Sequence, residues 1–377
     1  MTQFWLILIA FLSGLAGAFQ IPTLSLFLSS ELSSNLQAIG LFYSVNALTG
    51  IVISLWLAVV SDRLIFRRRL VIFCYLAAVA NGLLFAFCRH YLVLICAGSF
   101  LMALANSAIP QLFALAREHR SHPRFNSLLR AQLSLAWVLG PPLAFSLVSA
   151  VGFDMLYLCT AMIFLFVMVL LFLVPDKGRR PATKPGGPAQ ANPIPLTAGI
   201  LFLASTLMWS CSALYLIDIP VYLTSQLGLA PNRVGIMMGL AALLEIPVIL
   251  LVGRYVVRMG NRKILIWGQY AGMLFFTGLS LASLFWQLLL LQIFNAIFIG
   301  VIATSGMFIF QSLLHQRQGL ATTLFTNSVS VGIIIAGLLQ SIIKNQSHTT
   351  LYTLAVILLV LSRGVLTLVH TEQDDAI

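Results

Sequence analysis

The sequence contains few charged residues, and few acidic ones in particular. Asp, Glu, Lys and Arg make up 8% of the 377 residues, whereas a soluble globular domain typically carries about 25%. Hydrophobic residues make up 60% of the chain, and the mean hydropathy is +1.00. Apolar runs of roughly 20 residues recur along it, which is the length of a membrane-spanning helix. An ordinary soluble domain is therefore excluded. A transmembrane β-barrel is excluded too, because alternating segments of about 10 residues are absent.

The motifs of metal and nucleotide chemistry are also missing. The five cysteines show neither a CxxC pair nor the Cys/His spacing of a zinc site. No Gly-rich phosphate loop is present, so we do not expect ATP hydrolysis to drive the protein. We expect no metal, no cofactor and no enzymatic activity.

Basic residues are in excess, and their placement indicates topology. The chain has 21 Lys and Arg against 10 Asp and Glu, a net charge of +11. The bases cluster between apolar runs, as "DRLIFRRR", "REHRSHPR", "DKGRRPATK" and "RMGNRK". Because Lys and Arg concentrate in cytoplasmic loops, these clusters predict the cytoplasmic side and argue against a nucleic-acid partner.

The apolar runs predict an all-α polytopic membrane protein with twelve transmembrane helices. Their limits are 4–29, 37–60, 70–88, 92–115, 127–150, 155–174, 197–224, 234–256, 264–283, 287–313, 320–343 and 350–370. The Pro- and Gly-rich stretch 175–196 reads as a cytoplasmic linker. It would join an N-terminal six-helix half, 1–174, to a C-terminal half with a short tail, 197–377. Both termini are then cytoplasmic.

The two halves resemble each other in sequence. Gln20-Ile21-Pro22 falls on Asp218-Ile219-Pro220, and "FRRRLVI" falls on "GNRKILI". A parallel repeat of six helices joined by a basic linker is the layout of major facilitator transporters, whose substrate site lies between the halves near the midplane. The GxxxG pairs Gly235–Gly239 and Gly268–Gly272 predict close helix approach.

Polar side chains within the apolar runs are the candidates for substrate binding. They are Gln20, Asn46, Asn106, Gln111, Trp137, Tyr215, Tyr222, Gln292, Asn295 and Asn327. Each amide both donates and accepts hydrogen bonds, which suits a neutral, hydroxyl-rich ligand, and the aromatic rings could stack on a sugar. The alternative for any one amide is a hydrogen bond between helices, worth about 0.6 to 2 kcal/mol.

Two carboxylates fall inside predicted helices. Asp218 lies in the outer part of 197–224 and Glu245 near the centre of 234–256. An ionised acid there costs roughly 3 kcal/mol, so such groups normally pair or line a pathway. Burial favours the neutral form, which makes both acids candidates for proton coupling. The alternative is an acid that is permanently protonated or paired, with a structural role.

The loop "SDRLIFRRR" resembles the signature loop of the major facilitator superfamily. Asp62, Arg63, Arg67 and Arg68 match its pattern, with Ala58 in place of the first glycine and one extra residue before the basic pair. The second copy keeps Arg262, but Val257 stands where the acid would be. The resemblance implies that this loop is a gating latch.

Over nearly its whole length the chain resembles the bacterial sugar efflux transporter family. The carrying stretches include "IGLFYSVNALTGIVISLWLA", "RAQLSLAWVLGPPLAF" and "STLMWSCSALYLIDIP". The resemblance implies secondary active export of sugars and small glycosides by proton antiport. It also implies a multi-pass protein of the bacterial inner membrane, and we expect a monomer. A multidrug exporter of the same superfamily and a proton-coupled sugar importer stay open as alternatives, since residues alone do not fix direction.

Overall fold

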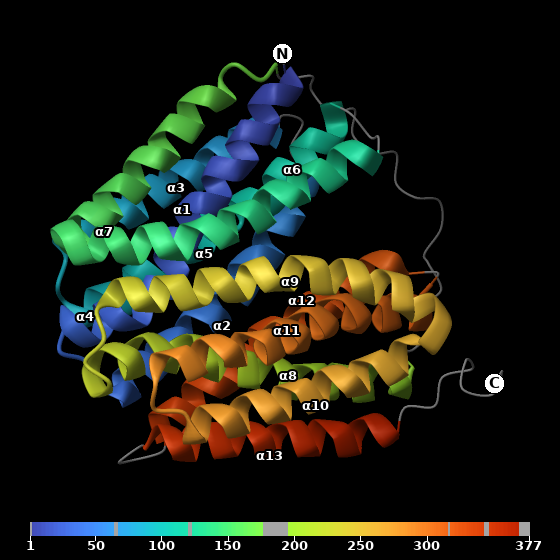
Figure 1. Cartoon of the computed structure of the whole chain (residues 1–377). Helices are drawn as coiled ribbons and strands as arrows, with labels where there is room; N and C mark the ends of the chain where they lie inside the picture. The colour runs from blue at the N-terminus through green and yellow to red at the C-terminus, as the bar shows by residue number, and fades with distance from the viewer. Residues whose placement is uncertain are drawn as a thin grey trace. The chain divides into compact units, whose positions relative to one another are not determined.

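The computed structural model describes residues 2–63, 67–119, 123–175, 195–315, 317–342 and 347–368. Within these ranges every regular element is a helix (Figure 1). Most of the predicted linker, 176–194, and the tail, 369–377, lie outside the described ranges.

The long helices fit the predicted spans closely. They are α1 (Thr2–Ser30), α2 (Leu36–Arg63), α3 (Arg67–Phe87), α7 (Pro123–Leu171), α8 (Leu196–Val221), α9 (Pro231–Met259), α10 (Asn261–Leu281), α11 (Phe285–Leu313), α12 (Gln318–Ile342) and α13 (His348–Thr367). The fourth span is made of α4 (Tyr91–Val93), the π-helical η1 (Leu94–Gly98), α5 (Ser99–Asn106) and α6 (Ala108–His119). Eleven stretches of the described chain are long and apolar enough to cross a membrane.

Helix α7 contains two of the predicted spans. Gly152 interrupts its helical backbone with φ 83° and ψ 178°, a conformation that is essentially restricted to glycine. The stretch Leu128–Leu171 is therefore two helices in sequence, and the predicted total of twelve spans is confirmed.

Backbone contacts divide the chain into two compact units. The first comprises Met1–Ser34, Val45–Ala189 and Gly228–Gly239, and the second Asn35–Ser44, Gln190–Leu227 and Leu240–Ile377. The beginning of α2 thus packs in the second unit and the beginning of α9 in the first. The predicted division into halves at 174 and 197 stays a prediction.

In the first unit, α1 packs along α7, and α3 packs on α5 and α7 (Figure 1). The apolar interior is crossed by one polar contact, in which the Ser13 Oγ lies 2.7 Å from the Tyr75 hydroxyl and joins α1 to α3. Gly235 and Gly239 let the start of α9 approach α7. A Cβ at Gly235 would lie 2.6 Å from the Pro141 carbonyl oxygen, and this confirms the predicted close approach.

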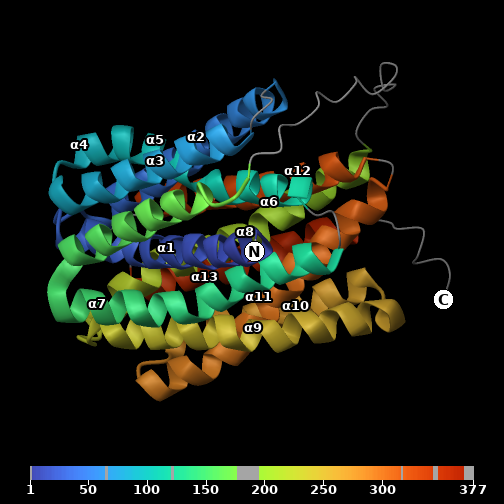
Figure 2. The same ribbon diagram turned by 90° about the horizontal axis from the view of Figure 1, so that it is seen from above.

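In the second unit, α8 packs on α11, α12 and α13, and α10 packs on α11 and α13 (Figure 2). A buried polar chain links three of these helices. The Gln269 Nε2 donates to the Ser362 Oγ at 3.0 Å, which donates to the Ala204 carbonyl at 2.9 Å. Gly268 and Gly272 again permit close approach, since a Cβ at Gly268 would lie 2.5 Å from a methyl group of Val301.

Candidate functional site

The fully buried carboxyl group of Asp218 is the centre of a polar cluster in the second unit. Its Oδ2 lies 2.6 Å from the His348 Nδ1 and accepts a hydrogen bond of 2.8 Å from the Tyr352 hydroxyl. The side chain of Asp218 is 0% exposed and that of His348 is 7% exposed. The Oδ1 of Asp218 has no hydrogen-bond partner among the described residues. One carboxyl oxygen is therefore held by α13 and the other is unoccupied.

The backbone of α8 changes its winding directly beside this cluster. Pro220 lacks the N–H of a regular helical residue, and the π-helical segment η2 (Tyr222–Gln226) begins two residues later. Such π-helical turns occur frequently at functional sites. The ring of Tyr222 lies against the ring of His348, with centroids 4.1 Å apart. Tyr222, a predicted binding residue, thus covers the histidine that holds Asp218.

Sequence reasoning missed His348. The predicted last span begins at residue 350, but α13 begins at His348, with Ser347 as its N-cap accepting from the Thr350 N–H. That N-cap was the available signal, because a Ser before an apolar run marks a helix start and places the next residue in the first turn.

Three of the predicted binding residues contact one another instead of an open site. The Gln292 Oε1 accepts from the Asn295 Nδ2 at 2.9 Å and from the Tyr215 hydroxyl at 3.2 Å. The Gln292 Nε2 donates to the Leu288 carbonyl at 3.0 Å. Gln292 and Asn295 lie on α11 and Tyr215 on α8, and all three are buried. Their hydrogen bonds connect these two helices, which is the structural alternative for buried amides.

Two amides of the first unit, unlike those of Gln292 and Asn295, have side-chain nitrogens without a described hydrogen-bond partner. The Gln20 Nε2 on α1 and the Asn46 Nδ2 on α2 are both buried and have no hydrogen-bond partner among the described residues. An unpaired buried donor costs roughly 1–3 kcal/mol. These two nitrogens are therefore suited to an acceptor that the chain does not supply.

The remaining predicted binding residues are partly or fully exposed, or contact a neighbouring helix. Asn106, at the end of α5, is exposed, while Trp137 and Asn327 are half-buried. The Gln111 Oε1 accepts from the Ser61 hydroxyl at 2.9 Å and so joins α6 to α2. In the described part of the chain, no group of three His, Cys, Asp or Glu side chains could hold a metal ion.

Glu245 differs from Asp218 in its surroundings. It lies half-buried on α9, beside α11, where a Cβ at Gly300 would be 3.5 Å from the Glu245 Cγ. No described residue forms a hydrogen bond or an ion pair with its carboxyl group. Of the two acids predicted for proton coupling, Asp218 is thus paired and Glu245 has no partner among the described residues.

The latch arginines have matching positions in the two repeats. At the start of α3, the Arg68 Nη1 donates to the Val174 carbonyl at 3.1 Å, and at the start of α10 the Arg262 Nη2 donates to the Leu366 carbonyl at 3.4 Å. In each case a cation meets the C-terminal end of a helix, where the macrodipole favours positive charge. Arg67 lies beside Arg68 at the start of α3, whereas the side chains of Asp62 and Arg63 lie outside the described part of the chain.

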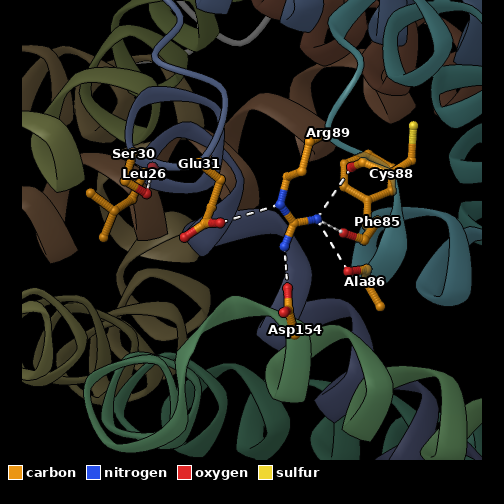
Figure 3. A network of polar contacts seen from close by, with 8 residues as sticks. All are labelled: Leu26, Ser30, Glu31, Phe85, Ala86, Cys88, Arg89 and Asp154. Carbon is orange, nitrogen blue, oxygen red and sulfur yellow. Dashed lines mark hydrogen bonds and ion pairs between the residues drawn. The ribbon is translucent and has the colours of Figure 1, made fainter.

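A second cluster, also missed from the sequence, is built around Arg89 of the first unit (Figure 3). Its guanidinium group pairs with Glu31 at 3.2 Å and with Asp154. It also donates to the carbonyl groups of Phe85, Ala86 and Cys88 at the end of α3. The cluster joins the ends of α1 and α3 to the break in α7.

The model of the Major Facilitator Superfamily matches residues 6–201 and 200–375. Sugar efflux transporter A of Escherichia coli (strain K12) is 48% identical over 368 residues, covering 94% of this chain and 93% of that protein. The protein of the same name from Dickeya chrysanthemi is 46% identical, covering 89% and 87%. The chain belongs to the sugar efflux transporter family. Sugar efflux transporter C of Escherichia coli (strain K12), another relative of this family, is 38% identical, covering 93% and 91%.

Solved structures give the fold of this sugar efflux transporter family member independently. The nucleoside transporter NupG has a TM-score of 0.75 at 15% identity, covering 97% of each chain. A bacterial homologue of the iron transporter ferroportin, in its inward-facing state, has a TM-score of 0.73 at 16% identity, covering 97% and 98%. The predicted major facilitator fold is therefore confirmed.

Proposed function

We propose that the chain exports sugars and small glycosides across the bacterial inner membrane, in exchange for protons, by alternating access. The observation that carries this proposal is the 48% identity to a protein named for sugar efflux over 93% of that protein's length. Both termini and the linker are cytoplasmic in this proposal, and the chain acts as a monomer.

The sugar hydroxyls bind the unpaired amides of the first unit, Gln20 and Asn46. The support is that both amide nitrogens are buried donors without a partner among the described residues, and a sugar hydroxyl offers the acceptor that each lacks. Trp137 and the exposed Asn106 are the further sugar contacts of this unit. In the second unit, Asn327 is the one amide of the predicted set that lies outside the buried group around Gln292.

Gln292, Asn295 and Tyr215 act as positioning residues in this proposal. Their amide and hydroxyl groups are already bonded to each other, so a sugar would have to displace hydrogen bonds of equal quality. They set how α8 lies on α11, and through α8 they set the position of Asp218.

Proton antiport requires that protons and sugar compete within one cycle. Asp218 carries the proton: its carboxyl group is buried in a membrane helix, where the charged form is costly, and its Oδ1 has no hydrogen-bond partner among the described residues. Glu245 is the second candidate, because it has no described ion partner to hold its charge. The arginine contacts of Arg68 and Arg262, with Asp62 and Arg63, form the latch that stabilises one state of the cycle.

Neutralising each acid separately tests the coupling. In inverted membrane vesicles, we measure pH-driven accumulation of radiolabelled lactose and glucose, with a cationic dye as a third probe, for Asp218→Asn and Glu245→Gln. The amides keep the shape of the acids but cannot ionise. The variant at the coupling residue loses accumulation against a gradient and keeps sugar exchange at equilibrium.

Each other outcome contradicts a stated part of the proposal. Full pH-driven accumulation in both variants would rule out antiport through these acids. Transport of the dye without either sugar would favour a multidrug exporter. Accumulation that requires the opposite pH gradient would favour a sugar importer.

A further inference from the structure

We propose that His348 is the proton relay of Asp218, so that the two side chains bind and release the coupled proton as one pair. This inference rests on the proposed proton coupling through Asp218 and adds the route by which the proton reaches it.

The His348 and Asp218 side chains are in contact but differ in their exposure. The His348 Nδ1 is 2.6 Å from the Asp218 Oδ2, a short hydrogen bond along which a proton can pass between the two side chains. The carboxyl group is 0% exposed, whereas 7% of the histidine side chain is exposed where α13 begins. Of the pair, only His348 reaches the surface of the unit, and a proton bound for Asp218 passes through its ring.

The proton steps balance without any further reactant. In the deprotonated pair, the neutral imidazole keeps its Nδ1 proton and donates a hydrogen bond through it to the Asp218 carboxylate. A proton then binds the Nε2, and the Nδ1 proton moves to the Asp218 Oδ2, which leaves a neutral carboxyl group and an imidazole with its proton on Nε2. The pair has taken up one proton, and its charge has changed from −1 to 0. Release follows the same steps in reverse.

The titratable groups around the pair are few. Tyr222 stacks on the His348 ring, and the Tyr352 hydroxyl donates a hydrogen bond to the Asp218 Oδ2. Tyr215 lies three residues before Asp218 on α8. Of the charged residues on the packed helices, Arg262 lies at the far end of α13, on the Leu366 carbonyl. Among the described residues no Lys or Arg forms an ion pair with Asp218, and the nitrogen base that contacts its carboxyl group is His348.

The first unit provides an internal comparison. Both repeats carry a buried Leu-Tyr pair on their last helix, Leu156-Tyr157 and Leu351-Tyr352. Four residues before each tyrosine stand Phe153 and His348, and the residue matching Asp218 is Gln20. Phe153 packs on Phe27 with ring centroids 5.5 Å apart, and the Arg89 guanidinium group lies over the same Phe27 ring.

The two positions that match Asp218 and His348 are therefore held in the first unit by residues that do not titrate, Gln20 and Phe153. Packing alone does not need an Asp and a His at this place, and their presence in the second unit points to a proton as their ligand.

The first test titrates the pair without any sugar. We follow the infrared band of the protonated carboxyl group of Asp218, assigned by its loss in Asp218→Asn, as a function of pH in the purified full chain in lipid. In His348→Asn the amide nitrogen takes the place of Nδ1, so the hydrogen bond is kept and the titration is removed. The wild type titrates in the two steps of a coupled pair, and His348→Asn titrates in one.

Tyr352→Phe is the matched control, because it removes the other hydrogen bond to the same oxygen and leaves both titrating groups. We expect the Asp218 carboxyl band of Tyr352→Phe to titrate in two steps, as in the wild type. An unchanged two-step profile in His348→Asn would overturn the inference.

Transport separates this inference from the proposed function. His348→Asn lowers the initial rate of pH-driven lactose uptake into the vesicles by about 100-fold, the lower end of what a positioned proton-transfer group contributes, and retains equilibrium exchange. If Asp218→Asn keeps full pH-driven accumulation, the proposed coupling through Asp218 is wrong. If Asp218→Asn loses it and His348→Asn keeps it, the relay alone is wrong.

A double variant guards against misfolding. Asp218→Gln with His348→Phe copies the residues Gln20 and Phe153 that stand at the matching positions of the first unit. We expect it to fold, to exchange lactose at equilibrium and to lose pH-driven accumulation. Retained accumulation in this variant would contradict both the relay and the coupling.

Discussion

Arg89 joins the ends of three helical segments through a single side chain. Its charge is shared between two carboxylates that belong to other helices, Glu31 and Asp154, while its remaining donors meet carbonyl groups at the end of α3 (Figure 3). Its guanidinium group also lies over the Phe27 ring, 5.1 Å from the centroid. Because helix-end carbonyls have no intrahelical partner, this cation stabilises α3 as well as its contacts with α1 and α7.

Arg89→Gln should therefore lower the stability of the first unit more than either acid does. We expect a loss of about 1.5–3 kcal/mol, the range for hydrogen bonds to charged groups. Glu31→Gln and Asp154→Asn, which remove exposed ion pairs, should each cost about 0–1 kcal/mol. Thermal unfolding of the purified variants in detergent measures which of the three substitutions lowers the stability most. Equal losses for Arg89→Gln and Asp154→Asn would show that the carbonyl contacts contribute nothing.

The sequence predicted some residues of the candidate site, but it did not predict which other residues they contact. Asp218 stood out because a carboxylate is rare in a membrane span. His348 did not, since its role depends on a contact across 130 positions of the chain that no local pattern contains. Gln292 and Gln20 look alike in sequence, yet one is bonded to its neighbours and the other is not. Only the tertiary structure separates them.

At the scale of elements, the break in α7 determines the number of spans. Gly152 lies at φ 83°, and nothing lies within 4 Å of the position where its Cβ would be. The constraint is therefore the backbone conformation and not space. The twelve spans were predictable because apolar length is a local property. The π-helical segments η1 and η2 were not, because they depend on how backbone hydrogen bonds shift within a continuous apolar run.

Gly152→Ala should destabilise the chain by about 1–3 kcal/mol, the cost of a side chain in this region of backbone conformations. Gly199→Ala is the matched control: Gly199 lies within α8, and its Cβ would also meet nothing within 4 Å. There alanine should be neutral or stabilise by about 0.5–1 kcal/mol, since glycine is a poor helix former. Thermal unfolding of both variants measures the two stability changes. A neutral Gly152→Ala would mean that α7 bends elsewhere.

At the scale of the whole molecule, the distribution of basic residues predicts the orientation in the membrane. A cysteine at Gly187, in the predicted cytoplasmic linker, should resist impermeant thiol reagents in intact spheroplasts of a cysteine-free background. A cysteine at Ser283, exposed between α10 and α11, should be labelled from outside. The reversed pattern would invert the orientation and the direction assigned to the cycle.

The matching contacts of Arg68 and Arg262 bear on how a duplicated chain diverges. Both copies place an arginine on the carbonyl end of their last helix, so this contact is common to the two six-helix repeats. Asp218 and His348 have Gln20 and Phe153 as their counterparts, so the titratable pair belongs to one copy only. The two repeats thus share the arginine contact at one end and differ in the residues of the titratable pair. This difference breaks the symmetry of the architecture at the place where we propose that a proton is exchanged.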